Sequence, residues 1–169
     1  YLFFYRCTSH TFSYIRWNGD YSSTQLIAQS GLNVVYTPLC GTGMEPVHAV
    51  LGRLGVNITT VECQAKPDGD FKTCEYPNPE TDAALNESYK VAEHAPCDVI
   101  LGTDPDADRV AIAVPCEGGY RKLSGNELGF MLLDYVLKAR TAKNDIPEGA
   151  ITVRSIVSSP LADRIAAYY

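Results

Sequence analysis

Residues 32–62 alternate between the patterns of a strand, a helix and a strand, which restricts the fold more than any other feature. The β-rich segment LNVVYT (32–37) is followed by the turn residues PLCGTG. Apolar residues then recur at the spacing of a buried helical stripe: Val47, Val50, Leu51 and Leu54. Gly55 ends this helix, and VNITTVE (56–62) has the composition of a second strand. Such a β-α-β unit predicts a parallel or mixed sheet covered by helices.

The same alternation continues along the rest of the chain. A long polar loop leads to a helix expected from about Thr81, as N-cap, to Glu93, burying Leu85, Tyr89 and Ala92. CDVILGT (97–103) is a continuous apolar run, as expected of a strand buried on both faces. Further strands are expected at 109–115, 120–123 and 150–159, and further helices at 124–140 and from 160 onward.

We place a domain boundary near Gly118, where a turn precedes the repetition of the pattern. Residues 1–117 are expected to form an α/β domain with a mixed, mainly parallel sheet covered by helices. Residues 118–169 are expected to form the first part of a second α/β domain that the chain does not complete.

Charge and hydropathy exclude several classes of function. The 169 residues carry a formal net charge of -6 and no Lys/Arg-rich run, which argues against nucleic-acid or anionic-membrane binding. No apolar stretch approaches the ~18 residues that a membrane span needs.

The N-terminus has neither the basic region nor the small-residue cleavage site of a signal peptide, and its first residue is not Met, as in a fragment. The six cysteines are scattered without a CxxC pair, so we expect mostly buried, reduced thiols and a cytoplasmic location.

The segment LGTDPDADRV (101–110) places Asp104, Asp106 and Asp108 at alternate positions, directly after the predicted buried strand. In an extended loop these three side chains point the same way, and carboxylates held so close require a compensating positive charge. Carboxylate oxygens are hard ligands that suit Mg²⁺. The adjacent Arg109 could pin a carboxylate or reach toward a phosphate.

A solvated acidic turn is the alternative interpretation, because Asp and Pro are common in loops. The position at the carboxyl end of a buried strand, where open α/β sheets bind ligands, favours a metal site. An EF-hand does not fit, since Arg109 and Pro115 occupy the places of its Gly and Glu. The turn CGTGMEP (40–46) could present N–H groups to an anion, or be only a tight connection between strand and helix.

Five segments in this order resemble the α-D-phosphohexomutase family of phosphoglucomutases and phosphomannomutases: VVYTPLCGTG, PNPE, ILGTDPDADRVAIAV, LSGNELGFMLLDYVL and VRSIVSSPLADRIAAYY. The resemblance covers residues 32–169, as the second domain and the start of the third. It implies a four-domain enzyme that moves a phosphoryl group between the C1 and C6 oxygens of a sugar. It further implies that Asp104, Asp106 and Asp108 bind Mg²⁺ and that Arg109 contacts phosphate or substrate. Arg154 stands in place of a lysine that lies near substrate in relatives.

The chain departs from the family pattern in two places. The phosphoserine motif Thr-Ala-Ser-His-Asn-Pro is absent; CTSHTF (7–12) matches it poorly, so we do not expect Ser9 to be the nucleophile. Cys40 stands where many relatives carry His in TPLHGTG. We therefore expect the metal loop but no catalytic residue in this segment, and no activity from the segment alone. Its partners would be a sugar phosphate and the remaining domains of the same polypeptide, with no nucleic acid and no membrane.

The resemblance makes a phosphoglucomutase, which interconverts glucose 1-phosphate and glucose 6-phosphate, the leading hypothesis for the intact protein. The alternative is a non-catalytic module of the same fold that binds a divalent metal or an anion. A haloacid-dehalogenase-type phosphatase fits less well, because it needs Thr or Val shortly after its second Asp, whereas Asp106 is followed by ADR.

Overall fold

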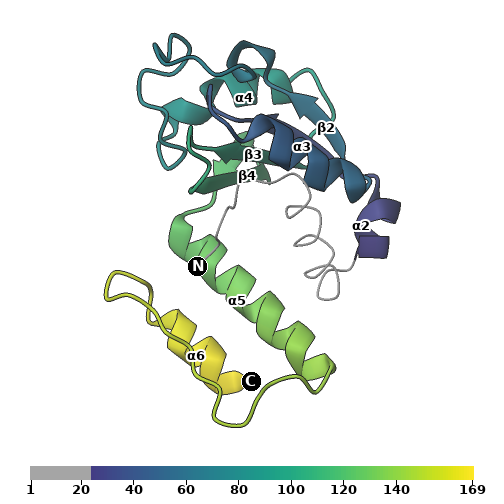
Figure 1. Cartoon of the computed structure of the whole chain (residues 1–169), viewed down its shortest axis with the longest axis vertical. Helices are drawn as coiled ribbons and strands as arrows, with labels where there is room; N and C mark the ends of the chain where they lie inside the picture. The colour runs from purple at the N-terminus through teal and green to yellow at the C-terminus, as the bar shows by residue number, and fades with distance from the viewer. Residues whose placement is uncertain (1–23) are drawn as a thin grey trace. The chain divides into compact units, whose positions relative to one another are not determined.

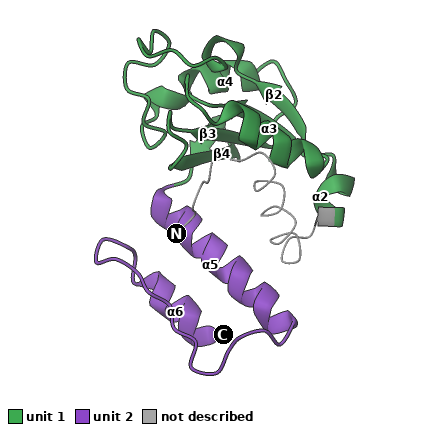
Figure 2. Cartoon of the chain, in the orientation of Figure 1, with its two compact units in different colours: residues 1–123 green, residues 124–169 purple. Residues whose placement is uncertain are grey.

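The structure is a computed structural model that describes residues 24–169 of the chain. These residues divide into two compact units, with the division of the chain between Leu123 and Ser124 (Figure 1, Figure 2). Among the described helices, none is both long and apolar enough to cross a membrane.

The first unit contains a five-stranded mixed sheet with the order β2-β1-β3-β4-β5. β1 lies between β2 and β3 and pairs in parallel with both, whereas β3–β4 and β4–β5 are antiparallel pairs. The strands are β1 (Asn33–Thr37), β2 (Asn57–Thr60), β3 (Val99–Thr103), β4 (Val110–Cys116) and β5 (Gly119–Lys122). The expected mixed sheet is therefore confirmed, but it is not mainly parallel: two of the four strand pairs are parallel, at the β2–β1–β3 side, and two are antiparallel.

Helices cover both faces of this sheet, as the apolar runs of β1 and β3 require. The helix α3 (Met44–Arg53) packs Val47 and Leu51 against a cluster that contains Val34, Tyr36 and Val56. On the other face, Val35 and Ile100 pack with Leu85, Ala92, Val61, Ala111 and Ala113. Alternate residues of β1 thus face opposite layers, which is the period of a pleated strand. The short helix α2 (Thr24–Ser30) precedes β1.

The helix expected from Thr81 to Glu93 is shorter than predicted and begins differently. A 3₁₀ turn, η2 (Ala83–Leu85), leads into α4 (Asn86–Ala92), and the hydroxyl of Thr81 donates to the carbonyl of Asn78 instead of capping a helix. Two of the three predicted positions are buried, since Leu85 is fully buried and Ala92 is 6% exposed, whereas Tyr89 is only partly buried against the same cluster. A second 3₁₀ turn, η1 (Glu62–Gln64), follows β2.

The boundary between the units lies beyond the predicted position near Gly118. The strand expected at 120–123 pairs as β5 with β4, so it completes the first sheet instead of opening the second unit. The remaining unit consists of α5 (Gly125–Ala142), α6 (Leu161–Tyr168) and the segment between them. The hydroxyl of Ser124 accepts from the N–H of Glu127, whose carboxylate in turn accepts from Ser124, so this capping box starts α5.

The strand predicted at 150–159 is not formed in the described second unit. Its apolar side chains are exposed instead, by 84% at Ile151, 88% at Val153 and 97% at Ile156. Residues 124–169 contain no other strand, and a strand needs a neighbour to satisfy its backbone N–H and C=O groups. Residues 150–159 therefore have a sequence that favours a strand, but the second unit contains no neighbouring strand with which they could pair.

Candidate functional site

The loop of residues 104–109, here called the aspartate loop, connects β3 to β4 at the carboxyl end of β3, as predicted from the sequence. The N–H of Ala107 donates to the carbonyl of Asp104 at 3.0 Å, which closes a tight turn. Ala107 takes a left-handed conformation with φ 59°. A small residue lowers the crowding of that conformation, although only glycine avoids its cost. The turn brings three alternate carboxylates onto one side of the loop.

Asp104 is the fixed member of the cluster. Its side chain is fully buried, and its two oxygens accept from the backbone N–H of Arg109 at 2.9 Å and from Nε of Arg109 at 2.8 Å. Burial acts to raise the pKa of Asp104, but the hydrogen bonds from Arg109 outweigh it and hold this pKa below its usual value. Asp104 is therefore charged at neutral pH and held in one orientation.

Asp106 and Asp108 are exposed, and each brings an oxygen close to the Asp104 carboxylate. One oxygen from each of the three lies within 4.8 Å of the others. The hydrogen bond with Asp104 and the negative charge of Asp106 raise the pKa of Asp108, so the cluster resists a third full negative charge. Oxygens around Mg²⁺ lie about 2.1 Å from the ion, hence at most about 4.2 Å apart, so a small inward rotation of the exposed side chains would suffice. The donor set fits a hard divalent cation.

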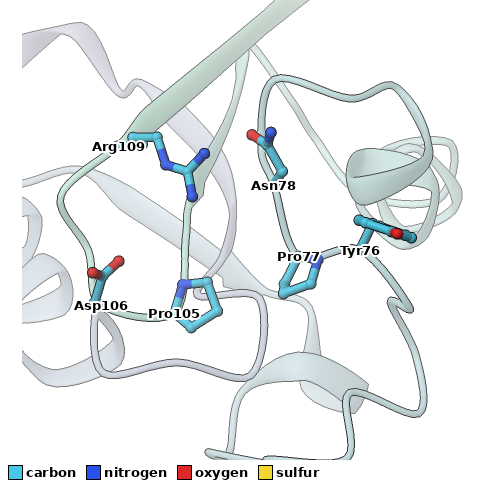
Figure 3. Close-up of a pocket in the computed structure, with 6 residues that line it drawn as sticks. All are labelled: Tyr76, Pro77, Asn78, Pro105, Asp106 and Arg109. Atoms are coloured by element: carbon cyan, nitrogen blue, oxygen red, sulfur yellow. The ribbon is translucent and has the colours of Figure 1, made fainter.

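A cavity of about 370 Å³ opens beside the loop. Figure 3 shows Arg109, Asp106 and Pro105 on one side of it and the segment Tyr76–Asn78 on the other. The cavity therefore combines a guanidinium and a carboxylate with the rings of Tyr76 and two prolines, and its size is typical of sites for small molecules. Pro77 and Asn78 of the PNPE segment, one of the five segments that resemble the family, thus lie beside the aspartate loop.

Arg154, the other predicted substrate ligand, belongs to the second unit and is already engaged there. Its Nε and Nη2 donate to Asp163 at 2.7 and 2.8 Å, and Nη1 donates to the carbonyls of Ser155 and Ser158. A phosphate would have to displace the carboxylate of Asp163. Ser9, which was not expected to be the nucleophile, lies outside the described residues.

The CGTG turn is a tight connection whose N–H groups are used within the protein. The N–H of Gly41 donates to the carbonyl of Pro38, and the N–H of Thr42 donates to the carbonyl of Pro105. This favours the structural interpretation, a tight connection between strand and helix, over an anion site.

Cys40 is buried, with its sulfur 3.5 Å from the hydroxyl of Thr73. All five described cysteines are free thiols, but only Cys40 and Cys74 of them are buried.

Sequence reasoning missed the hydroxyl pair that underlies the loop. The hydroxyls of Tyr36 and Thr103 lie 2.9 Å apart in the interior, directly before Asp104. A Cβ built on Gly43 would lie 2.5 Å from both hydroxyl oxygens, so this glycine makes room for the pair. The glycines of the turn were visible in the sequence, but their contacts with residues about 60 positions away were not.

Comparison with known proteins points to one family. Residues 13–118 match the family model described as phosphoglucomutase/phosphomannomutase, alpha/beta/alpha domain II. A probable phosphomannomutase of Haemophilus influenzae is 39% identical over 140 residues, which cover 82% of this chain and 28% of that protein. A phosphoglucomutase of Staphylococcus epidermidis is 38% identical over 145 residues, covering 85% and 26% respectively. The chain thus spans little more than a quarter of these relatives.

Two solved structures share the fold. A phosphoglucomutase/phosphomannomutase family protein from Burkholderia thailandensis superposes with a TM-score of 0.60 at 16% identity, covering 76% of this chain and 26% of that one. A putative phosphomannomutase from Thermus thermophilus gives a TM-score of 0.57 at 18% identity, covering 79% and 29%. With the family model and the curated relatives, these matches establish that the chain belongs to the phosphoglucomutase/phosphomannomutase family and carries its domain II.

Proposed function

We propose that the chain is a segment of a magnesium-dependent sugar-phosphate mutase, an isomerase that transfers a phosphoryl group within its substrate. One observation carries the proposal: three carboxylates converge at the end of β3, beside an arginine and an open cavity, in a chain of this family. The relatives carry the names phosphomannomutase and phosphoglucomutase at nearly equal identity, so the hexose is a separate proposal. We propose glucose 1-phosphate and glucose 6-phosphate, because the TPLCGTG, YPNPE and DPDADR segments together resemble bacterial phosphoglucomutases.

Asp104, Asp106 and Asp108 are the residues that would hold Mg²⁺. When bound there, the ion would supply positive charge that offsets the charge of a transferring phosphoryl group. Arg109 fixes Asp104 through two hydrogen bonds, so one ligand is oriented in advance. The exposed Asp106 and Asp108 can then move toward it.

Arg109 also lines the cavity, where its guanidinium would contact a phosphate by charge-assisted hydrogen bonds. Its Nε is committed to Asp104, so contact with phosphate would fall to the terminal nitrogens. Tyr76 and the neighbouring prolines offer apolar surface, and Asn78 offers an amide, which suits a ligand with both ring carbons and hydroxyls. We retain Arg154 as a second substrate contact, which requires release of Asp163.

The remaining domains of the intact polypeptide would supply the nucleophile and most of the sugar site. We therefore expect no mutase activity from this segment alone. Neither nucleic acid nor membrane is an expected partner, because the net charge is -6, and the cytoplasm is the expected compartment.

The metal site can be tested directly on the 169-residue chain. Mn²⁺ is added to the ¹⁵N-labelled protein, and the broadened amide signals are assigned. We expect broadening centred on residues 103–109 that is lost in Asp106→Asn and retained in Asp70→Asn, an exposed acid outside the cluster. Broadening that is scattered, or that survives in Asp106→Asn, would mean that the loop is only an acidic turn.

The reaction is tested on the intact protein. Conversion of glucose 1-phosphate to glucose 6-phosphate should require Mg²⁺ and should fall at least about 100-fold in Asp106→Asn, as for loss of a group that stabilises transferring charge. Metal binding without any hexose phosphate conversion would support the non-catalytic metal-binding module instead. Conversion of mannose phosphates in preference to glucose phosphates would overturn the choice of hexose alone.

A further inference from the structure

The turn that follows β1 lies directly against the aspartate loop. A Cβ built on Gly41 would come within 2.2 Å of the Cα and 2.4 Å of the carbonyl oxygen of Pro105. Both are backbone atoms, so a side chain at position 41 cannot be accommodated by rotating a neighbouring side chain. Gly41 does not have a left-handed φ. The requirement for glycine here therefore comes from the contact with Pro105 and not from backbone conformation.

Thr42 adds a polar connection at the same place. Its N–H and its hydroxyl both donate to the carbonyl oxygen of Pro105, at 2.9 and 3.1 Å. That carbonyl belongs to the peptide that joins Pro105 to Asp106. Two donors on one oxygen fix the plane of this peptide, because each restricts its rotation in a different direction. The direction in which Asp106 leaves the backbone is set as a result.

The turn can hold the loop only if it is itself rigid. Leu39 and Cys40 are both left-handed, with φ 47° and 58°, a conformation that costs about 1 kcal/mol or more for each residue with a side chain. Cys40 is held by backbone hydrogen bonds to Gln64 and Asp68, and Leu39 is fully buried. The surrounding first unit thus imposes the shape of the turn.

A loop with three acidic residues tends to open, because its carboxylates repel one another when no cation is present. We infer that Gly41 and Thr42 are positioning residues that hold the Pro105 carbonyl, so that Asp106 faces Asp104 before a cation binds. The identity of the ligand as a divalent cation rests on the proposed function, whereas the contact of Gly41 and Thr42 with Pro105 does not. Neither residue touches the cation; both act through the Pro105–Asp106 peptide.

The test uses the 169-residue chain with Gly41→Ala and Thr42→Val, each beside a matched control. Gly69→Ala is the control for the added methyl group, because a Cβ at Gly69 meets nothing within 4 Å. Thr42→Ser is the control for the hydroxyl, which it retains. Three quantities are measured: the Mn²⁺ dissociation constant from amide broadening, the metal-free chemical shifts of residues 103–109, and the urea midpoint of unfolding.

We expect Gly41→Ala to weaken Mn²⁺ binding by about 10- to 100-fold, the range for loss of a group that orients a metal ligand. Thr42→Val should weaken it several-fold, and Thr42→Ser and Gly69→Ala should bind as the unmodified chain does. The shifts of residues 103–109 should move in Gly41→Ala and Thr42→Val, while those of β1 and α3 stay in place. A purely structural role would lower the urea midpoint and leave Mn²⁺ affinity of the folded protein unchanged.

The outcomes separate this inference from the proposed function. Unchanged Mn²⁺ affinity together with unchanged loop shifts in both variants would overturn the inference. If the unmodified chain fails to bind Mn²⁺, the metal proposal fails, and the metal-free shifts of Gly41→Ala against Gly69→Ala still decide whether the turn positions the loop. If Gly41→Ala does not fold, the comparison of Thr42→Val with Thr42→Ser decides.

Discussion

Gly102 lies in β3 two residues before Asp104, and its missing side chain leaves room for Leu85 on the neighbouring layer. A Cβ built at Gly102 would lie 2.9 Å from Cδ2 of Leu85 and 3.5 Å from Cγ2 of Thr37. Leu85 is fully buried in the cluster that contains Val35 and Ile100. The contact predicts that substitutions at 85 and 102 do not act independently, because each changes the volume that the other must fill.

The magnitudes follow from burial and from the close contact. Leu85→Ala removes a fully buried side chain and should lower the free energy of unfolding by about 3 kcal/mol. Gly102→Ala forces a methyl group against Cδ2 of Leu85 and should cost about 1.5 kcal/mol. In the double variant the methyl group of Ala enters the space that Leu85 vacated and restores about one buried methylene, worth about 0.8 kcal/mol. The double variant should therefore cost about 2–2.5 kcal/mol, well below the additive value of about 4.5 kcal/mol.

Urea unfolding, followed by the amide signals of residues 33–122, measures these four free energies in the first unit. Leu26→Ala serves as the control, since Leu26 is 68% exposed and its loss should change stability by less than about 0.5 kcal/mol. Costs that add within about 0.5 kcal/mol would refute the reasoning, because distant or non-contacting sites behave in that way.

Three further predictions concern the rest of the chain. Ser124→Ala breaks the capping box of α5 and should destabilise the first turn of that helix by about 1 kcal/mol, measured by amide hydrogen exchange; unchanged exchange would contradict the role of the cap. The hydrogen bonds from Arg154 lower the pKa of Asp163. The ion pair should therefore be intact at and above the usual carboxyl pKa of about 3.9 and be lost only as the pH falls below that value. A ¹³C titration of Asp163 with a midpoint above about 4 would contradict this expectation. In thiol labelling followed by peptide mapping, exposed Cys116 should react before Cys74, which is buried and whose pKa burial raises; the reverse order would show that the local packing is wrong.

The position of the aspartate loop could be predicted because its signals are local. The apolar run before Asp104 and the strand pattern after Arg109 predict two strands, and the loop between them must lie at the edge of the sheet. The three carboxylates come together as predicted, but the turn at Ala107 brings them there and not the extended loop that the prediction assumed. The pairing of Arg109 with Asp104 was one of two uses foreseen for this arginine. Which partner each donor takes depends on the turn at Ala107, and a left-handed alanine has no clear sequence signal.

The cavity depended on contacts that are distant in sequence. Residues 76–78 and 105–109 line it together, although about 30 positions separate them. Composition identified both segments as loops, but it does not indicate which loops lie next to each other in the folded chain. The same holds for Gly41, whose contact with Pro105 joins two loops at the ends of neighbouring parallel strands.

By itself, the sequence determined the strands β1, β3 and β4, the helices α3 and α5, and the acidic loop, because periodicity and turn residues act over a few positions. The tertiary structure decided which strands are neighbours, and with that the boundary between the units. Gly119–Lys122 became a strand through pairing with β4, whereas residues 150–159, with a stronger β pattern, did not become one. The physical reason is that a helix satisfies its hydrogen bonds within its own segment, but a strand satisfies them only through another strand.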